Sequence, residues 1–181
     1  DYCYKKYENR IPLKGKLNGN SFFFYDFIKN KINAKLNGKI NEENNSISGK
    51  WSSTKNSDIA FSLKLASQTG GSLENRYGFG DNEKTEAFFK KIKASIVKDD
   101  KIWLSKNIKY PINVTVSGKK TKIKTAKDFI AKYPKIITAK YKSDIQNSCI
   151  CDIFSNWRGA MFGNGIVWIN QYDGDDNSKI T

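Results

Sequence analysis

The chain has 181 residues, of which 38% are hydrophobic and 13% aromatic, and its 32 Lys and Arg against 18 Asp and Glu give a net charge of +14. This apolar content predicts a packed core, and no apolar run approaches the roughly 18 residues of a membrane-spanning helix. The absence of histidine excludes Ser-His-Asp and Cys-His nucleophile activation and histidine-ligated metals. We expect one domain or two small ones, without a cofactor.

The N-terminus and the three cysteines bear on the compartment. The chain starts at Asp1 without an initiator Met, which we interpret as removal of a secretory signal, with an artificial truncation as the alternative. On an extended strand Cys149 and Cys151 would face the same side, so either can pair with Cys3 and leave one thiol over. Three buried thiols in a cytosolic protein are the alternative. We favour a periplasmic or secreted protein with one disulfide.

Strand patterns fill the first part of the chain, from Arg10 to Ala66. Apolar residues recur there at largely even spacing, and residues 46–52 and 58–65 alternate between apolar and polar with period two. The pattern predicts about five antiparallel strands in a meander with one solvent-exposed face, within a β-rich module over residues 1–70. Three dipeptides supply turn positions that tolerate positive φ: Asn18-Gly19, Asn37-Gly38 and Ser48-Gly49.

Three short segments of this module read IPLKGKL at 11–17, ISGKW at 47–51 and FSLKL at 61–65. They resemble a β-rich module common in bacterial exported proteins and lipoproteins. The sequence pattern of that module is approximately I-x-L-x-G, then I-x-G-x-W, then F-x-L. The resemblance implies structural roles for two glycines in strands or turns and two core aromatics, namely Gly15, Gly49, Trp51 and Phe61. A Gly-rich linker is expected over residues 71–82.

Helical patterns follow the linker. Asp81 or Asn82 can cap a helix whose apolar stripe includes Phe88 and Ile92. A shorter helix starts at Asp99-Asp100 and ends before Tyr110-Pro111, because the residue before proline avoids the α region. These patterns begin an α+β domain that we expect over residues 83–172.

The rest of this domain is predicted as a hairpin around Ser117-Gly118, two helices and two closing strands. Thr125 and Asp128 form a capping-box variant that opens the first of these helices. Pro134 is expected to start the second helix in its first turn. An acidic flexible tail is expected over residues 173–181.

The order of these elements, with KDFIAKY at 127–133 and NWRGAMFGNGIVW at 156–168, resembles bacterial exported domains of the nuclear-transport-factor-like, cystatin-like α+β class. The resemblance covers about residues 83–170 and implies a cone-shaped α+β domain with a curved antiparallel sheet, whose mouth can hold a ligand. That class hosts isomerases, dehydratases, immunity proteins and pure binders, so it implies fold more than function.

Positive charge is concentrated in the middle of the chain, where nine lysines and a single acid, Asp128, occur between Lys119 and Lys142. Such a field attracts acidic proteins, anionic glycans or lipids, or nucleic acid. Proteins that recognise specific bases use bidentate hydrogen bonds from Arg and Asn side chains. The chain has only three Arg, so nucleic acid is the unlikely partner. A solvated lysine surface without a partner is the alternative. The candidate anion-binding surface consists of Lys119, Lys120, Lys122, Lys124 and Lys127.

A ligand site in the cone would be lined by Tyr110, Trp157, Arg158 and Trp168. The Arg158 guanidinium can stack on a ring or form paired hydrogen bonds to an acidic group. The alternative is that Arg158 is an ordinary turn residue and that Trp157 and Trp168 belong to the core. Asp128 is better explained as an acid at a helix N-terminus, and no carboxylate pair has acid–base spacing. We therefore assign no catalytic residue and no metal site.

The favoured function is a non-catalytic exported bacterial binding protein, an inhibitor or immunity-type protein acting on an acidic protein or an anionic envelope component. The first alternative is a small-molecule-binding or enzymatic cone of the isomerase or dehydratase type. The second is a nucleic-acid binder of low specificity.

Overall fold

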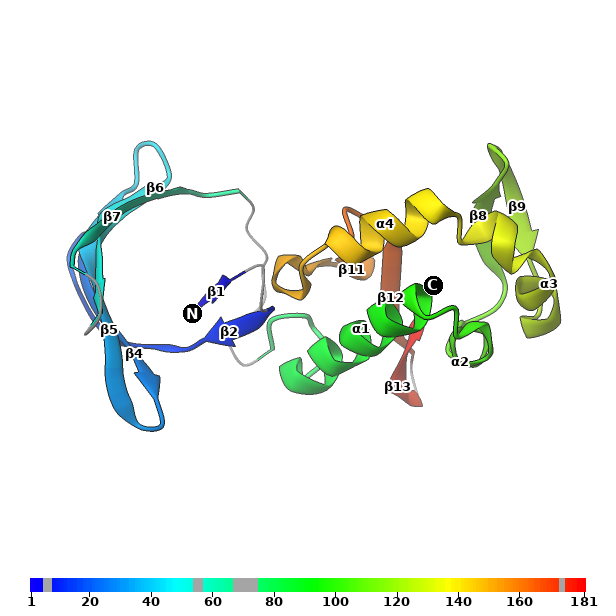
Figure 1. Cartoon of the computed structure of the whole chain (residues 1–181), viewed down its shortest axis with the longest axis horizontal. Coiled ribbons are helices and arrows are strands. Elements are labelled where there is room, and N and C mark those ends of the chain that lie inside the picture. The colour runs from blue at the N-terminus through cyan, green and yellow to red at the C-terminus, as the bar shows by residue number, and fades with distance from the viewer. Residues whose placement is uncertain (5–7, 54–56, 67–74, 173–174) are drawn as a thin grey trace. The chain divides into compact units, whose positions relative to one another are not determined.

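The computed structural model describes residues 1–4, 8–53, 57–66, 75–172 and 175–181. The chain divides into two compact units, unit 1 (Asp1–Gln68) and unit 2 (Thr69–Thr181). The architecture is α+β with antiparallel sheets, as the sequence predicts (Figure 1). No helix in the described ranges is long and apolar enough to cross a membrane. Residues 71–74 of the expected linker lie outside the described part of the chain.

Unit 1 contains the predicted five-stranded meander, with the strand order β3-β4-β5-β6-β7. Its strands are β3 (Leu13–Asn18), β4 (Ser21–Ile28), β5 (Lys31–Asn41), β6 (Ser46–Ser53) and β7 (Ile59–Lys64). A hairpin that the sequence patterns did not predict precedes it, formed by β1 (Tyr2–Tyr4) and β2 (Asn9–Ile11). The Tyr2 hydroxyl donates a hydrogen bond to the buried Asp26 carboxylate on β4, which joins the hairpin to the sheet.

The strand register separates apolar from polar side chains on the two faces of this sheet, because successive residues of a strand point to opposite faces. Residues that pair directly from β3 through to β7 form a cross-strand row. One face carries two such rows. The first consists of Leu17, Phe22, Gly38, Gly49 and Phe61, and the second consists of Gly15, Phe24, Leu36, Trp51 and Ile59. The row between them, on the opposite face, is Lys16, Phe23, Asn37, Lys50 and Ala60. The sheet is therefore apolar on one face and rich in lysine on the other.

Gly38 and Gly49 lie inside strands, so the expectation that they occupy turns was wrong. They face each other across β5 and β6, and a Cβ atom on Gly38 would lie 2.1 Å from the Ser48 carbonyl oxygen and 2.8 Å from the Gly49 Cα. Close backbone approach is a recognised reason for glycine in a strand. Gly19, in contrast, lies in the predicted turn with a φ of +54°.

Unit 2 contains the helices α1 (Asn82–Val97), α2 (Lys101–Lys106), α3 (Ala126–Ile136) and α4 (Ala139–Asn147) and the 3₁₀ helix η1 (Ile150–Asp152). The four α-helices start after side-chain caps, because each capping oxygen accepts a backbone N–H that has no partner within the helix. These caps are Asp81, Asp100, Thr125 and Thr138.

The expected role of Pro134 was wrong. This proline lies near the end of α3, and α4 begins only after Thr138, whose hydroxyl accepts the Tyr141 N–H at 3.2 Å. The position of the Thr138 cap, rather than the proline ring, therefore sets the start of α4.

The strands of unit 2 form a hairpin and a four-stranded sheet. The predicted hairpin consists of β8 (Ile112–Val116) and β9 (Lys119–Ile123), and the sheet contains β10 (Phe154–Asn156), β11 (Gly159–Phe162), β12 (Val167–Tyr172) and β13 (Asp175–Ile180). Residues 175–180, expected in a flexible tail, thus form β13. The strand is held at its end because the Ile180 N–H donates to the Asn107 carbonyl at 2.8 Å and Ile180 packs against the core.

The core of unit 2 lies between the helices and one face of the sheet (Figure 1). Ala160, Phe162, Val167 and Ile169 supply the buried side chains of β11 and β12. The Phe162 ring lies 5.8 Å from the Phe89 ring of α1, so this helix packs directly on the sheet.

Candidate binding surfaces of unit 2

Tyr110, the first residue of the predicted ligand site, precedes β8 and points into the protein. Its hydroxyl donates a hydrogen bond to the Ser105 carbonyl oxygen at 3.1 Å. Burial, and to a smaller extent the negative charge of Asp128, raises the pKa of Tyr110 to about 12. The phenol therefore stays protonated at neutral pH and serves as an internal hydrogen-bond donor.

Trp157 and Arg158 occupy the turn between β10 and β11. Trp157 is 83% exposed, and the guanidinium carbon of Arg158 lies 4.8 Å from the centre of its indole ring. A guanidinium over an indole face is a cation–π contact. The Arg158 N–H donates to the Asn156 Oδ1 at 2.8 Å, so the turn is ordered by its own residues and presents a stacked cation to solvent.

Trp168 lies on β12 directly opposite Met161 of β11, on the face of the sheet that points away from the core. Its indole N–H donates to the Gly165 carbonyl at 3.1 Å. None of the four predicted ligand residues lines the surface groove or the interior cavity of unit 2. Each makes local contacts of its own.

A small cavity with a volume of about 80 Å³ lies within the core of unit 2. Its lining is mainly apolar and includes Ile92, Phe129 and Ile137. Pockets for small ligands have volumes of about 300–1,000 Å³. This cavity is therefore smaller than a typical small-ligand pocket.

An open groove with a volume of about 800 Å³ lies on the surface of unit 2. Phe79, Phe88 and Trp103 form its apolar part, and the Phe88 and Trp103 rings lie 5.8 Å apart at 55° to each other. Its polar lining consists of Asp81, Lys84, Thr85, Asn107, Ser178 and Lys179. We did not predict this groove from the sequence, because Phe88 and Trp103 belong to helical stripes that read as core and Phe79 lies in the expected linker.

A helix cap determines the charge state of the acidic side chain in the groove. Asp81, the one carboxylate in its described lining, caps α1 by accepting the Lys84 N–H at 2.9 Å. This hydrogen bond is the main cause that lowers the pKa of Asp81, so the carboxylate is ionised at neutral pH and pairs with the Lys84 ammonium at 3.6 Å. General acid or base catalysis needs a group that titrates near the working pH, and Asp81 does not.

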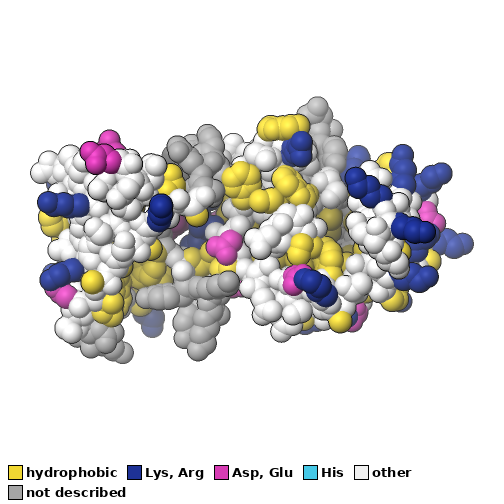
Figure 2. Space-filling view, turned by 90° about the horizontal axis from the view of Figure 1, so that it is seen from above, with side chains coloured by type: hydrophobic (Ala, Val, Ile, Leu, Met, Phe, Trp, Pro, Cys, Tyr) yellow, Lys and Arg dark blue, Asp and Glu magenta, His cyan; other side chains and the backbone are white. Residues whose placement is uncertain are grey.

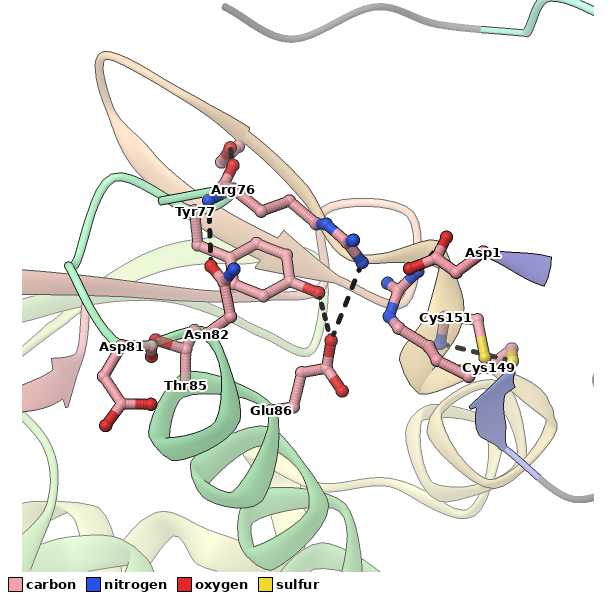
Figure 3. Close-up of polar contacts among 11 residues, drawn as sticks. Asp1, Arg76, Tyr77, Asp81, Asn82, Thr85, Glu86, Cys149 and Cys151 are labelled. Atoms are coloured by element: carbon pink, nitrogen blue, oxygen red, sulfur yellow. Dashed lines mark hydrogen bonds and ion pairs between the residues drawn. The ribbon is translucent and has the colours of Figure 1, made fainter. Parts of the chain in front are cut away.

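A polar cluster beside the groove fastens the segment before α1 to the rest of unit 2 (Figure 3). The Tyr77 hydroxyl donates to Glu86 Oε1 at 2.7 Å, and Arg76 Nη1 lies 4.0 Å from the same oxygen. The Arg76 N–H donates to Asn82 Oδ1 at 2.8 Å, and the Ser155 hydroxyl donates to the Arg76 carbonyl at 3.0 Å. These contacts position Phe79 at the groove, which gives the cluster a structural role.

All five lysines of the predicted anion-binding surface are exposed, and Lys and Arg side chains gather at the end of unit 2 that β8, β9 and α3 form (Figure 2). Lys120 and Lys122 lie opposite Thr115 and Asn113 on the outer face of the hairpin. Asp128 is confirmed in the capped first turn of α3, where its N–H donates to the Thr125 hydroxyl at 3.1 Å.

Acidic partners compensate the charge of some lysines of unit 2 but not of others. Lys84, Lys140 and Lys142 form ion pairs with Asp81, Asp144 and Asp99. Within the described residues, none of the five surface lysines forms an ion pair. Their charge is therefore not compensated locally. We call Lys119, Lys120, Lys122, Lys124 and Lys127 the lysine surface.

The predicted single disulfide is confirmed, and it joins Cys3 to Cys151 and leaves Cys149 as a buried thiol. Cys149 and Cys151 do not lie on an extended strand. Cys149 instead caps η1, and its Sγ accepts the Cys151 N–H at 3.3 Å.

Comparison of the chain with family models, with curated proteins and with solved structures found no match. The lysine surface, the groove and the disulfide therefore carry the functional assignment.

Proposed function

We propose that the protein is a non-catalytic exported bacterial binding protein, of inhibitor or immunity type, that recognises an acidic protein or an anionic envelope component. The observation that carries this proposal is the lysine surface, in which five exposed lysines lack acidic partners within the described chain. Like charges that are close together repel one another, and an anionic partner relieves this repulsion.

Two further observations support the compartment and the fold class in this proposal. A disulfide persists in oxidising compartments, so the bond between Cys3 and Cys151 favours a periplasmic or secreted protein. Helix α1 packs through Phe89 on one face of the sheet of β10–β13, an arrangement that supports membership of the cone-shaped, cystatin-like class. This part of the proposal rests on the sequence resemblance and on the layer order.

The test measures binding to three anionic probes of different chemistry: poly-glutamate, heparin and a single-stranded oligonucleotide. The variant Lys120→Gln/Lys122→Gln/Lys124→Gln removes three charges of the lysine surface. The matched control Lys16→Gln/Lys35→Gln/Lys39→Gln removes three exposed charges from unit 1. Exposed charge pairs contribute about 0.2–1 kcal/mol each, so we expect the first variant to bind its preferred probe about 10-fold more weakly at low salt.

The control variant should retain affinity within about two-fold, and binding of the wild type should weaken with salt because exposed charges are screened. Equal losses in both triple variants would refute a localised surface and indicate an effect of net charge alone. A clear preference for the oligonucleotide over poly-glutamate and heparin would favour the nucleic-acid alternative.

The groove favours a second candidate function, binding of a small amphiphilic molecule. Its aromatic walls match the apolar body of such a ligand, and Lys84 and Lys179 match an anionic group. Trp103→Ala should then abolish binding of an aromatic sulfonate dye while the triple lysine variant leaves it unchanged. Dye binding that survives Trp103→Ala would exclude this site.

A further inference from the structure

Strand β7 forms one edge of the five-stranded sheet of unit 1 (Figure 1). Within the described ranges no strand pairs with its outer side. Ile59 and Leu63 project from the apolar face and are 51% and 59% exposed. An exposed apolar edge strand is a template for pairing with another chain.

The register shows which backbone groups of β7 point outward. Leu65 donates its N–H to the Asn45 carbonyl at 2.8 Å, and the pairing with β6 continues with Leu63 opposite Ile47 and Phe61 opposite Gly49. Hydrogen-bonded and non-hydrogen-bonded pairs alternate along an antiparallel ladder. The odd-numbered residues therefore bond to β6, and the even-numbered residues Ala60, Ser62 and Lys64 direct their N–H and C=O groups to the free edge.

The two edges of this sheet differ in how they are protected. On β3, the other edge, Lys14 and Lys16 flank Gly15, and edge lysines are a common device against edge-to-edge pairing. Strand β7 carries one lysine, Lys64, at its end, and an acid, Asp58, directly before its start. Only the β7 edge therefore combines opposite charges with an apolar row.

We propose that β7 pairs antiparallel with β7 of a second copy of this chain, about a two-fold axis at Phe61. In this register Phe61 lies opposite Phe61 of the second copy, and Leu63 lies opposite Ile59. Lys64 lies opposite Asp58, so each end of the ladder places an ammonium group beside a carboxylate. Opposite charges and apolar pairs directly across two strands are stabilising. The edge is thus complementary to itself in charge, in apolar pattern and in backbone hydrogen bonding.

The hydrogen bonds of this pairing follow from the outward-pointing groups. Ser62 of one copy and Ala60 of the other form a hydrogen-bonded pair, while Phe61 sits in a non-hydrogen-bonded pair, where side chains lie closest. Asp58 already contacts Lys50 at 3.2 Å within its own chain, so in the dimer each Asp58 lies near two ammonium groups. This local attraction offsets part of the repulsion between two chains of charge +14.

One strand pair buries less surface than a standard interface, so we expect a weak, concentration-dependent dimer with a Kd of about 10–100 µM. The experiment is sedimentation equilibrium of the whole oxidised chain across that range. Ser62→Pro removes one N–H on the free edge and spares the ladder to β6, as proline is tolerated on the open side of an edge strand. It should be monomeric at all concentrations. The matched control Ser62→Thr keeps the N–H and should dimerise like the wild type.

Charge exchange provides a second, independent test that does not alter the backbone. Lys64→Asp and Asp58→Lys should each weaken dimerisation about 10-fold, since each places like charges opposite each other, and the double exchange should restore it. A wild type that is monomeric at all concentrations would overturn the proposal. A dimer that persists in Ser62→Pro would also overturn it, because the two copies would then meet at another surface. The same holds if the double exchange dimerises no more tightly than the single variants.

Discussion

The rings of Phe22 and Phe61 lie 6.3 Å apart, although β5 and β6 separate their strands in the sheet. Between them in the same cross-strand row lie Gly38 and Gly49, which carry no side chains. The two rings can therefore approach each other above the backbone of Gly38 and Gly49. Aromatic side chains that cover glycines in this way help to pin the register of curved sheets.

Gly38→Ala tests this arrangement directly. Its methyl group would lie 2.8 Å from the Phe22 ring and 2.1 Å from the Ser48 carbonyl oxygen, so rings and backbone would have to move. We expect a loss at or above the upper end of the usual range of about 1–3 kcal/mol for overpacking. Guanidinium unfolding, followed through the amide NMR signals of β4 to β7, measures it.

Gly19→Ala is the matched control for this substitution. It has no atom within 4 Å of the added methyl group but a φ of +54°, so its cost should be only about 1 kcal/mol, from backbone strain. Equal losses in the two variants would contradict the steric account.

Thiol counting under three conditions tests the cysteine arrangement. The native protein should react slowly or not at all with an aromatic disulfide reagent, since Cys149 is 2% exposed. Unfolded but unreduced protein should release one equivalent, and unfolded, reduced protein should release three. In the Cys149→Ser variant, the unfolded but unreduced protein should have no reactive thiol.

Loss of the disulfide should also destabilise the fold. The bond joins residues 3 and 151, and closure of so long a loop in the unfolded chain corresponds to an upper estimate of about 5 kcal/mol. Cys3→Ser should therefore unfold at a clearly lower denaturant concentration than the wild type. An unchanged unfolding midpoint would show that the bond constrains little.

The raised pKa of Tyr110 predicts a stability change at alkaline pH. Because the folded-state pKa is about 12 and the ordinary value is 10.0, the folded protein keeps this proton at a pH where the unfolded chain loses it. The contribution to the free energy of unfolding is thus complete below pH 10 and disappears between pH 10 and about 12. Tyr110→Phe should show a flatter decline than the wild type in this window, and identical slopes would contradict the assignment.

Substitutions of Glu86 measure how firmly the segment before α1 is fastened. Glu86→Leu removes the acceptor for the buried Tyr77 hydroxyl, and an unsatisfied buried donor costs about 1–3 kcal/mol. Glu86→Gln keeps an acceptor oxygen, so its loss should be clearly smaller. Thermal unfolding of both variants gives the comparison, and a larger loss for Gln than for Leu would contradict the assigned role.

The sequence predicts elements whose signals are local. The period-two alternation indicates the meander of unit 1, and Thr125 marks the start of α3 because a capping side chain acts on a backbone N–H only three residues away. The hairpin β8–β9 follows from Ser117-Gly118, both of which have positive φ.

Features that depend on distant residues could not be predicted in this way. Gly38 follows an asparagine and reads as a turn, and only its pairing with Gly49 reveals a strand. The groove brings together Phe79, Phe88 and Trp103 from three separate segments. Strand β13 is held by a hydrogen bond from the Ile180 N–H to the Asn107 carbonyl oxygen. No local pattern contains these pairings.

The position of the cysteines along the chain also sets an order of events during biosynthesis. Cys3 leaves the ribosome before Cys149 and Cys151, and its partner Cys151 follows 148 positions later in the numbering (151 − 3). Cys149 arrives two residues before the correct partner and can compete for Cys3 while the chain is unfolded. Once unit 2 folds, Cys149 is buried and Cys151 remains only half-buried. Folding of unit 2 thus selects the pairing that oxidation alone would leave ambiguous.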